Sequence, residues 1–156
     1  MEKVHYEIRD VSRKDWDMAV QLAWDTFLVY EAPEYSLEGI RNFHDFVKGK
    51  ELKRLHELGE YEMYGAYCDG VIIGVISVRK NSHVSLLFVE PQYHHQGIAS
   101  TLLKYCFELS RMHGGNAMTV NSSPYAVQFY HKIGFRPLSP EVTKDGIKYT
   151  PMKITI

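Results

Sequence analysis

The stretch FVEPQYHHQGIASTLL, residues Phe88–Leu103, runs from an apolar strand through a proline and a histidine-rich loop into an amphipathic helix. Its glycine, Gly97, stands where that helix is expected to begin. The first N–H groups of a helix have no partner within the helix, and together with the helix dipole they favour a negative charge. Because glycine has no Cβ, a phosphate can approach the backbone closely there. The stretch therefore predicts an anion-binding loop between a strand and a helix.

A meander of three antiparallel strands is predicted directly before this loop. The β-rich runs are YEMYGAYC (residues 61–68), VIIGVISVRK (residues 71–80) and HVSLLFVE (residues 83–90). Asp69 and Gly70 separate the first two runs, and this pair favours a type I′ hairpin turn, in which both central residues need a positive φ. Asn81 and Ser82 are expected to form the second turn.

The segment before the meander is predicted to hold one strand and two or three helices. Residues 4–11 alternate as a strand does, and Ser12 followed by Asp15 indicates an N-cap with a capping-box-like partner. The helix that follows has an apolar face expected in the core, made of Trp16, Val20, Ala23, Trp24, Phe27 and Leu28. Ser36 is expected to cap a second helix, and residues 50–60 to add a short charged third one.

After the loop, the pattern alternates between helix and strand. The predicted elements are a helix over 97–113, a strand over 117–123, a helix over 124–133 and a hairpin that turns at Asp145–Gly146. Ser123 followed by Pro124 is a typical helix start, because proline at the first helical position needs no N–H partner. With no linker or repeat in sight, the order of elements predicts a single mixed α/β domain over residues 1–156.

The composition favours a globular protein without a polyanionic partner. The 156 residues are 45% hydrophobic and 24% charged, which suits one core. The net charge is −1 and the basic residues are scattered, so the sequence predicts neither nucleic-acid binding nor attraction to an anionic membrane. Cys68 and Cys106 are too few for a disulfide framework, and neither a signal peptide nor a long apolar segment is seen. We therefore expect a cytoplasmic protein with reduced thiols.

Two motifs together resemble the GNAT superfamily of acetyl-CoA-dependent N-acetyltransferases. They are LLFVEPQYHHQGIASTLL and VNSSPYAVQFYHKIGF, which follow an Asp-Gly hairpin in the order of that family. The similarity covers residues 61–136, and the order of elements agrees over the whole chain. The resemblance implies the GNAT acyl-CoA N-acyltransferase fold, an α/β architecture whose mostly antiparallel sheet has a splayed central strand pair and helices on both faces.

The resemblance also implies where acetyl-CoA binds. In the family, a loop of Arg or Gln, two residues, Gly, one residue and Gly or Ala holds the CoA pyrophosphate with backbone amides. The corresponding residues here are His94, His95, Gln96, Gly97, Ile98 and Ala99, followed by Ser100. His94 departs from the family's Arg or Gln, which puts the charge contribution at that position in doubt. A turn glycine before a surface helix is the alternative for Gly97.

Further cofactor contacts follow from the same resemblance. Phe88 and Val89 are expected to pair their backbone with the pantetheine arm, because the family splays this strand from the next one. Ser123 stands where many relatives place an asparagine that touches the cofactor. It either contacts CoA or only caps the following helix, and the cap is the favoured role. Asn121 can take over the contact.

Two residues are candidates for proton transfer. Tyr130 matches the family's tyrosine that protonates the leaving thiolate, and a phenol with a pKa of about 10 is a suitable donor to a thiolate. The alternative is a core tyrosine beside Phe129 and Phe135. His83 occupies the strand position where some histone-type relatives carry a glutamate base, and it is equally consistent with a structural histidine bonded to backbone at the strand start.

The acceptor site is expected in VYEAPEYS, residues 29–36. Glu31 and Glu34 with Tyr30 and Tyr35 suit a cationic amine, although solvated loop carboxylates are the commoner explanation. The histidines show no ligand spacing, so no metal is predicted.

The predicted activity is transfer of an acetyl group from acetyl-CoA to a primary amine of a small molecule or peptide, by direct attack. The alternatives are a CoA-binding sensor or partner-binding domain without turnover, and an enzyme that binds another acyl donor or a nucleotide at the same loop. The acceptor stays undefined, and the C-terminal hairpin is compatible with a homodimer and with a monomer.

Overall fold

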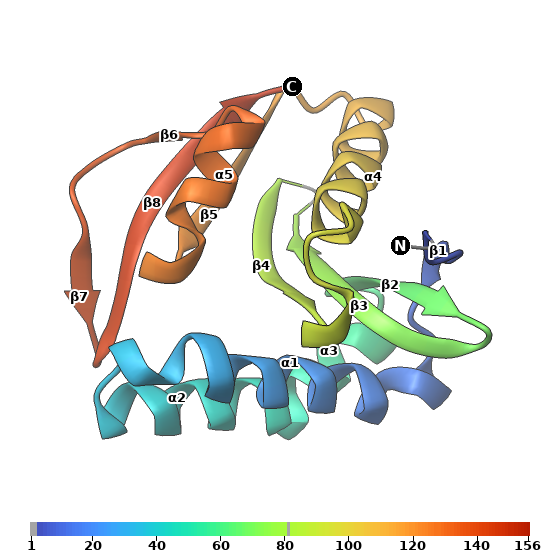
Figure 1. Cartoon of the computed structure of the whole chain (residues 1–156), viewed down its shortest axis with the longest axis horizontal. Helices are drawn as coiled ribbons and strands as arrows, with labels where there is room; N and C mark the ends of the chain where they lie inside the picture. Colours follow the sequence, from blue (N-terminus) through green and yellow to red (C-terminus); the bar gives the residue numbers. More distant parts are fainter. Residues whose placement is uncertain (1–2, 81) are drawn as a thin grey trace.

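The computed structural model describes residues 3–80 and 82–156, in which an eight-stranded sheet carries helices on both faces (Figure 1). The strands are β1 (Glu7–Asp10), β2 (Glu62–Cys68), β3 (Val71–Arg79), β4 (His83–Val89), β5 (Ala117–Ser122), β6 (Arg136–Pro137), β7 (Val142–Lys144) and β8 (Ile147–Thr155). The helices are α1 (Trp16–Tyr30), α2 (Leu37–Lys48), α3 (Lys50–Glu57), α4 (Ile98–Met112) and α5 (Val127–Ile133). Short 3-10 turns are η1 (Arg13–Asp15), η2 (Ala32–Glu34), η3 (Pro91–Tyr93) and η4 (Pro124–Ala126). None of the helices in these ranges is both long enough and apolar enough to cross a bilayer.

The strands follow the order β1-β2-β3-β4-β5-β8-β6, with β7 paired to β8. Every pair of neighbours is antiparallel except β4 and β5. Within the described residues, these two central strands pair only at His83↔Thr119 and Val84↔Val120. Strand β4 stays paired with β3 as far as Val89, so its last residues have no strand on the β5 side. The predicted splayed strand pair and the mostly antiparallel α/β fold are confirmed.

A β-bulge explains why β4 leaves β5. The register between β3 and β4 skips Ser85, directly after the last pair with β5 at Val84. A bulge bends its strand and increases the local twist. The buried Tyr61 hydroxyl donates to Ser85 Oγ at 3.0 Å and bonds Ser77 Oγ at 2.6 Å, so it ties both strands together at the bulge. This hydrogen-bonded cluster holds the bend that opens the sheet.

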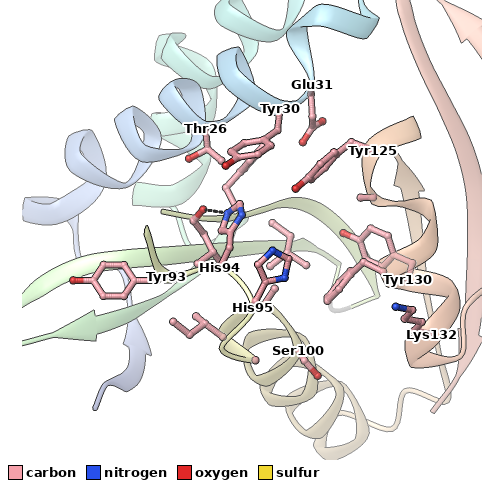
Figure 2. A pocket seen from close by; sticks show the side chains of 18 residues that line it. Thr26, Tyr30, Glu31, Tyr93, His94, His95, Ser100, Tyr125, Tyr130 and Lys132 are labelled. Atoms are coloured by element: carbon pink, nitrogen blue, oxygen red, sulfur yellow. Dashed lines mark hydrogen bonds between the residues drawn. The ribbon is translucent and has the colours of Figure 1, made fainter. Parts of the chain in front are cut away.

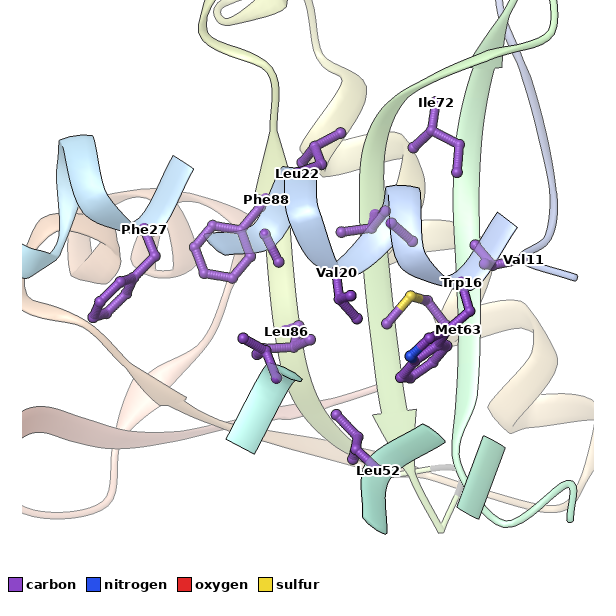
Figure 3. Close-up of a cluster of buried hydrophobic side chains, with 14 of the residues drawn as sticks. Val11, Trp16, Val20, Leu22, Phe27, Leu52, Met63, Ile72, Leu86 and Phe88 are labelled. Carbon is purple, nitrogen blue, oxygen red and sulfur yellow. The ribbon is translucent and has the colours of Figure 1, made fainter. Parts of the chain in front are cut away.

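The core lies in two layers, one on each face of the sheet. Helices α1 and α2 pack on one face, where Trp16, Val20 and Phe27 meet Met63 and Phe88 (Figure 3). On the other face, α4 and α5 bury a second cluster against the sheet, and it contains Ile98, Leu102, Met118, Tyr130 and Phe135. Both cysteines are free thiols; Cys106 is buried in this second cluster, whereas Cys68 is only partly buried.

Most predicted turns are confirmed. Asp69–Gly70 has φ values of +50° and +80°, and Asp145–Gly146 has +53° and +79°, as a type I′ hairpin turn requires. The Gly39 N–H donates to Ser36 Oγ at 3.1 Å, so Ser36 caps α2. Of the second meander turn, Asn81 lies outside the described residues. The first strand is shorter than predicted, and β6 was not predicted.

Two predictions about α1 are wrong. Ser12 makes no side-chain cap, because the chain enters α1 through the 3-10 turn η1 rather than directly. The Asp15 carboxylate instead accepts a hydrogen bond from the Tyr67 hydroxyl at 3.0 Å. Leu28 is 42% exposed, because it follows the fully buried Phe27 and so lies about 100° further around the helix. The rest of the predicted apolar face is buried or packs against the core.

Replacing Tyr61 by phenylalanine is expected to lower the free energy of unfolding by about 1–2 kcal/mol, because the buried Ser77 hydroxyl and the partly buried Ser85 hydroxyl lose their shared partner. Urea unfolding followed by circular dichroism measures this change. Tyr149→Phe is the control, since the Tyr149 hydroxyl makes no hydrogen bond in the described part of the chain. Equal stability of the two variants would contradict the role of Tyr61 at the bulge.

Candidate functional site

A cavity of about 660 Å³ lies where β4 leaves β5 (Figure 2). Its walls are the C-terminal end of α1, the end of β4, the loop into α4 with the first turn of that helix, and η4 with α5. Segments far apart in the sequence therefore meet at one place. The split between the strands leaves the backbone of Phe88 and Val89 at the cavity instead of inside a ladder.

The first turn of α4 presents unpaired N–H groups to the cavity. The first intrahelical bond runs from the Thr101 N–H to the Gly97 carbonyl at 2.9 Å, and no side chain caps this end of the described helix. The N–H groups of Ile98, Ala99 and Ser100 therefore have no helical partner, and all three residues line the cavity. No acidic residue lies in the first turn. This end of the cavity suits an anion.

Gly97 is required by its backbone conformation. Its φ is +81°, in the left-handed region that favours glycine, and a Cβ built on it would meet nothing within 4 Å. The open space next to Gly97 belongs to the cavity, so a ligand can reach the backbone there. The neighbouring His95 also has a positive φ of +63°, which is uncommon for a residue with a side chain.

His94 is held by the protein itself. Its Nε2 lies 2.6 Å from the Val89 carbonyl oxygen, so Nε2 carries a proton and donates it to this carbonyl. The His94 ring also lies 5.0 Å from the Tyr30 ring, centroid to centroid. The histidine that replaces the Arg or Gln of the family motif thus joins the loop to β4 and to α1.

Tyr130 belongs to the core and to the cavity at once. It is only 5% exposed, it packs at ring distances of 5.1 Å and 5.2 Å against Phe129 and Phe135, and it lines the cavity. Burial, and after it the charge of Glu31, raises the pKa of the Tyr130 phenol. The hydroxyl therefore keeps its proton throughout the neutral range.

Glu31 is a carboxylate at the end of α1 that points into the cavity on the side of Tyr125 (Figure 2). Burial raises the pKa of Glu31 from 4.5 to about 7, and the nearby Ser123 hydroxyl offsets a part of this rise. The Ser123 Oγ is itself buried and falls short of a hydrogen bond with any group of the described chain. The Glu31 charge contributes, after burial, to a raised pKa of Tyr35 as well as that of Tyr130.

Most residues predicted for the site line this cavity. They are Phe88, Val89, His94, His95, Gly97, Ile98, Ala99, Ser100 and Tyr130. Of the acceptor segment, Tyr30 and Glu31 line it, whereas Glu34 is exposed outside it and Tyr35 packs on Phe27.

Four predicted residues do not line the cavity. His83 lies at the paired end of β4, about 20 Å along the strand from Val89, and its Nδ1 bonds Thr119 Oγ1 at 2.8 Å. Burial lowers the pKa of His83. Asn121 is exposed on β5, and Gln96 has a buried Oε1 without a hydrogen-bond partner in the described chain.

Ser123 is the fourth of these residues, and the favoured cap at this position is wrong. Its side chain caps no helix, because the chain enters α5 through the 3-10 turn η4.

Seven cavity-lining residues were not predicted for the site: Thr26, Leu87, Tyr93, Tyr125, Ala126, Phe129 and Lys132. Thr26 comes from the buried side of α1, Tyr125 from η4 and Lys132 from α5. Nothing in their local pattern distinguishes them, because their role depends on how η4 and α1 meet. Within residues 3–80 and 82–156, no group of three His, Cys, Asp or Glu side chains comes together as metal ligands do.

Comparisons with known proteins agree with this architecture. Residues 31–156 match the acetyltransferase (GNAT) domain family. The uncharacterized N-acetyltransferase YafP of Escherichia coli strain K12 is 28% identical over 85 residues, which are 54% of this chain and 53% of that protein. The chain thus spans about half the length of this curated relative.

Two solved structures share the fold. A GCN5-related N-acetyltransferase from Rhodopseudomonas palustris superimposes with a TM-score of 0.86 at 21% identity, covering 100% of this chain and 99% of that one. The PaiA N-acetyltransferase from Thermoplasma acidophilum, in complex with coenzyme A, has a TM-score of 0.77 at 23% identity, covering 98% of this chain and 100% of that one.

Replacing Glu31 by glutamine is expected to stabilise the protein at pH 8. The folded protein holds the Glu31 proton more tightly than the unfolded chain, because the pKa is about 7 instead of 4.5. Below pH 4.5 the carboxyl is protonated in both states and costs nothing. Between pH 4.5 and 7 the unfolded chain ionises first, so the cost of the buried charge grows and is complete above pH 7.

The variant should therefore unfold about 4–8 °C above the wild type at pH 8, for a difference of about 2 kcal/mol after allowing for partial solvent access. The difference should vanish near pH 4.5. Thermal unfolding at both pH values measures it, with the exposed Glu34→Gln as the control. A difference that is the same at both pH values would contradict the raised pKa.

Proposed function

Because the chain belongs to the acetyltransferase (GNAT) domain family, we propose that it transfers the acetyl group of acetyl-CoA to a primary amine by direct attack of the amine on the thioester. The observation that carries this proposal is the cavity in the split between β4 and β5, with unpaired helix N–H groups at one end and Tyr130 and Glu31 at the other. The acceptor is a small molecule or a peptide. The coenzyme A complex of the Thermoplasma acidophilum neighbour supports the choice of donor.

The loop and the end of β4 would hold the donor. The N–H groups of Ile98, Ala99 and Ser100 would bind the pyrophosphate, and Gly97 leaves room for it. The Val89 carbonyl accepts the His94 hydrogen bond, so it points away from β3 and toward the cavity side. The backbone at the end of β4 would then pair with the amides of the pantetheine arm, as a β5 residue would in a closed sheet.

Tyr130 would supply the proton for the leaving thiolate. Attack by a neutral amine forms the C–N bond, and the C–S bond breaks as the Tyr130 hydroxyl protonates sulfur. Tyr130 can still act as the proton donor although its pKa is raised. Burial in the same cavity also raises the pKa of the CoA thiol, so the thiolate accepts a proton more readily. Backbone N–H groups near Val89 would polarise the thioester carbonyl.

We also infer that residues 1–156 form one acetyltransferase domain, since α1 and β1, which precede the family match, complete the cavity wall and the sheet. No metal is part of this mechanism. A cytoplasmic location and a homodimer remain predictions.

Calorimetric titration with acetyl-CoA is expected to show micromolar affinity that depends on the pantetheine arm. Desulfo-CoA, which keeps that arm, should bind about as well, and ADP, which lacks it, at least about 30-fold more weakly. ADP lacks the pantetheine arm, so it cannot pair with the exposed backbone at the end of β4. If ADP binds as tightly as acetyl-CoA, the proposed donor is wrong.

Tyr130→Phe should reduce thiol release about 100-fold while acetyl-CoA affinity changes by less than about threefold, because only the proton donor is removed. Release is followed with a thiol reagent in the presence of 2-phenylethylamine, butylamine, spermidine or a lysine-containing peptide. Tyr149→Phe serves as the matched control outside the cavity. A CoA-binding sensor would instead release no thiol with any of these amines, and its two variants would be indistinguishable.

A further inference from the structure

We propose that Glu31 accepts the proton of the incoming amine, and that this amine enters beside Tyr30 and Tyr125 as a single ammonium group on an aromatic or apolar body. The inference rests on the acetyl transfer proposed above and names its acceptor site, acceptor class and base. It replaces His83, which lies at the opposite end of β4 and is bonded to Thr119.

Glu31 lies where a second substrate can reach the donor's acetyl end. It is the residue directly after α1, and it lines the same cavity as Tyr130. Figure 2 shows the Glu31 carboxylate and the Tyr130 ring in this cavity, on either side of Tyr125. A proton acceptor and a proton donor thus stand at one end of the cavity, opposite the unpaired N–H groups of α4.

Two tyrosine rings stand beside this carboxylate. The centroids of Tyr30, from α1, and Tyr125, from η4, are 5.1 Å apart, so the rings join the two elements across the cavity. Tyr125 is 54% exposed although it lines the cavity, so it reaches from the interior to the surface. A flat or apolar substituent can pack on these rings, and an ammonium group is attracted to their faces.

The charge at this end favours a cation. The last carbonyl groups of α1 carry the negative end of the helix dipole, and no basic side chain lies in its last turn. Glu31 adds a full negative charge at the same point. Among the cavity-lining residues of the described chain, it is the only carboxylate, so a polyamine would leave further ammonium groups in the cavity without a counter-charge.

The environment of Glu31 makes it a base. Four groups from three further elements face it: Tyr35 after η2, Ser123 and Tyr125 at η4, and Tyr130 of α5. None of these four is a cation that would hold the carboxylate in its ionised form. Lys132 of α5 also lines the cavity, but in Figure 2 it lies beyond Tyr130 as seen from Glu31, and it makes no salt bridge with Glu31 in the described chain. With a pKa of about 7, Glu31 takes a proton roughly 300-fold more readily than an ordinary carboxylate. The buried, unpaired Ser123 hydroxyl is free to orient the carboxylate.

The protons balance over the reaction. The ammonium group passes one proton to Glu31, and the neutral amine attacks the thioester carbonyl. As the C–S bond breaks, Tyr130 protonates the sulfur, and the tyrosinate regains a proton from the nitrogen that becomes the amide. Glu31 then releases its proton to solvent. The ammonium group has thus lost two protons, of which one is on the thiol of CoA and one is in the solvent.

The test is the pH profile of kcat/KM for 2-phenylethylamine at saturating acetyl-CoA, with spermidine as the comparison amine. Wild-type kcat/KM should rise to about pH 7 and then level off, because ionised Glu31 takes the proton of the ammonium form. Glu31→Gln should lose at least about 100-fold at pH 7, and its kcat/KM should keep rising toward the ionisation of the amine near pH 10. Glu34→Gln, three residues on and outside the cavity, should behave as the wild type.

The outcomes distinguish a failure of the role of Glu31 from a failure of the proposed acetyltransferase activity. Acetyl-CoA affinity and thermal unfolding of Glu31→Gln show that the variant is folded and binds its donor. If the wild type acetylates 2-phenylethylamine and Glu31→Gln retains its rate and its plateau, Glu31 is not the base, although the acetyltransferase proposal stands. A higher kcat/KM for spermidine overturns the acceptor class. Thiol release with the lysine-containing peptide but not with 2-phenylethylamine overturns the acceptor class and leaves the acetyltransferase proposal standing. No thiol release by the wild type with any amine or peptide tested overturns the inference together with the proposed function.

Discussion

The departure of β4 from β5 is the constraint on which the rest of the structure depends. The parallel ladder between β4 and β5 could continue along the whole of β4, but the bulge at Ser85 bends the strand just after its last pair with β5. Tyr61 stabilises that bend with two hydrogen bonds, one buried and one partly buried. Opening a sheet exposes backbone groups that need partners. The structure leaves them facing a cavity, where a ligand with amide groups can satisfy them.

The opening also brings two helix ends of opposite polarity to one cavity. The N-terminus of α4, with its unpaired N–H groups, lies at one end, and the C-terminus of α1 with Glu31 lies at the other. An elongated cosubstrate with phosphates at one end and a reacting carbonyl at the other fits this polarity. An amine then meets negative charge at the end where it must react. The helix dipoles thus orient both substrates before any side chain takes part.

Local signals predicted the parts of the fold that depend on local chemistry. Asp69–Gly70 and Gly97 need backbone conformations that few residues adopt, so their positions were marked in the sequence. The bulge was not predictable, because HVSLLFVE is a uniform strand pattern and the skipped residue is set by pairing with β3. Glu31 and Glu34 occupy the same loop, and only the tertiary fold places Glu31 at the cavity, partly buried, while Glu34 stays exposed.

Burial of Glu31 costs stability at neutral pH, and this cost is a consequence of what a base requires. A carboxylate in water is ionised and weakly basic, whereas desolvation raises its affinity for a proton and destabilises its charged form to the same extent. The rise in pKa and the loss of folding stability come from the same desolvation free energy. A rearrangement that removed the loss of stability would therefore also remove the basicity of Glu31. The protein offsets this loss of stability elsewhere, in the apolar layers that hold α1 and α5 against the sheet. A carboxylate kept in this state among tyrosines, with a salt bridge to none of its neighbours in the described chain, is better explained by proton transfer than by structural support.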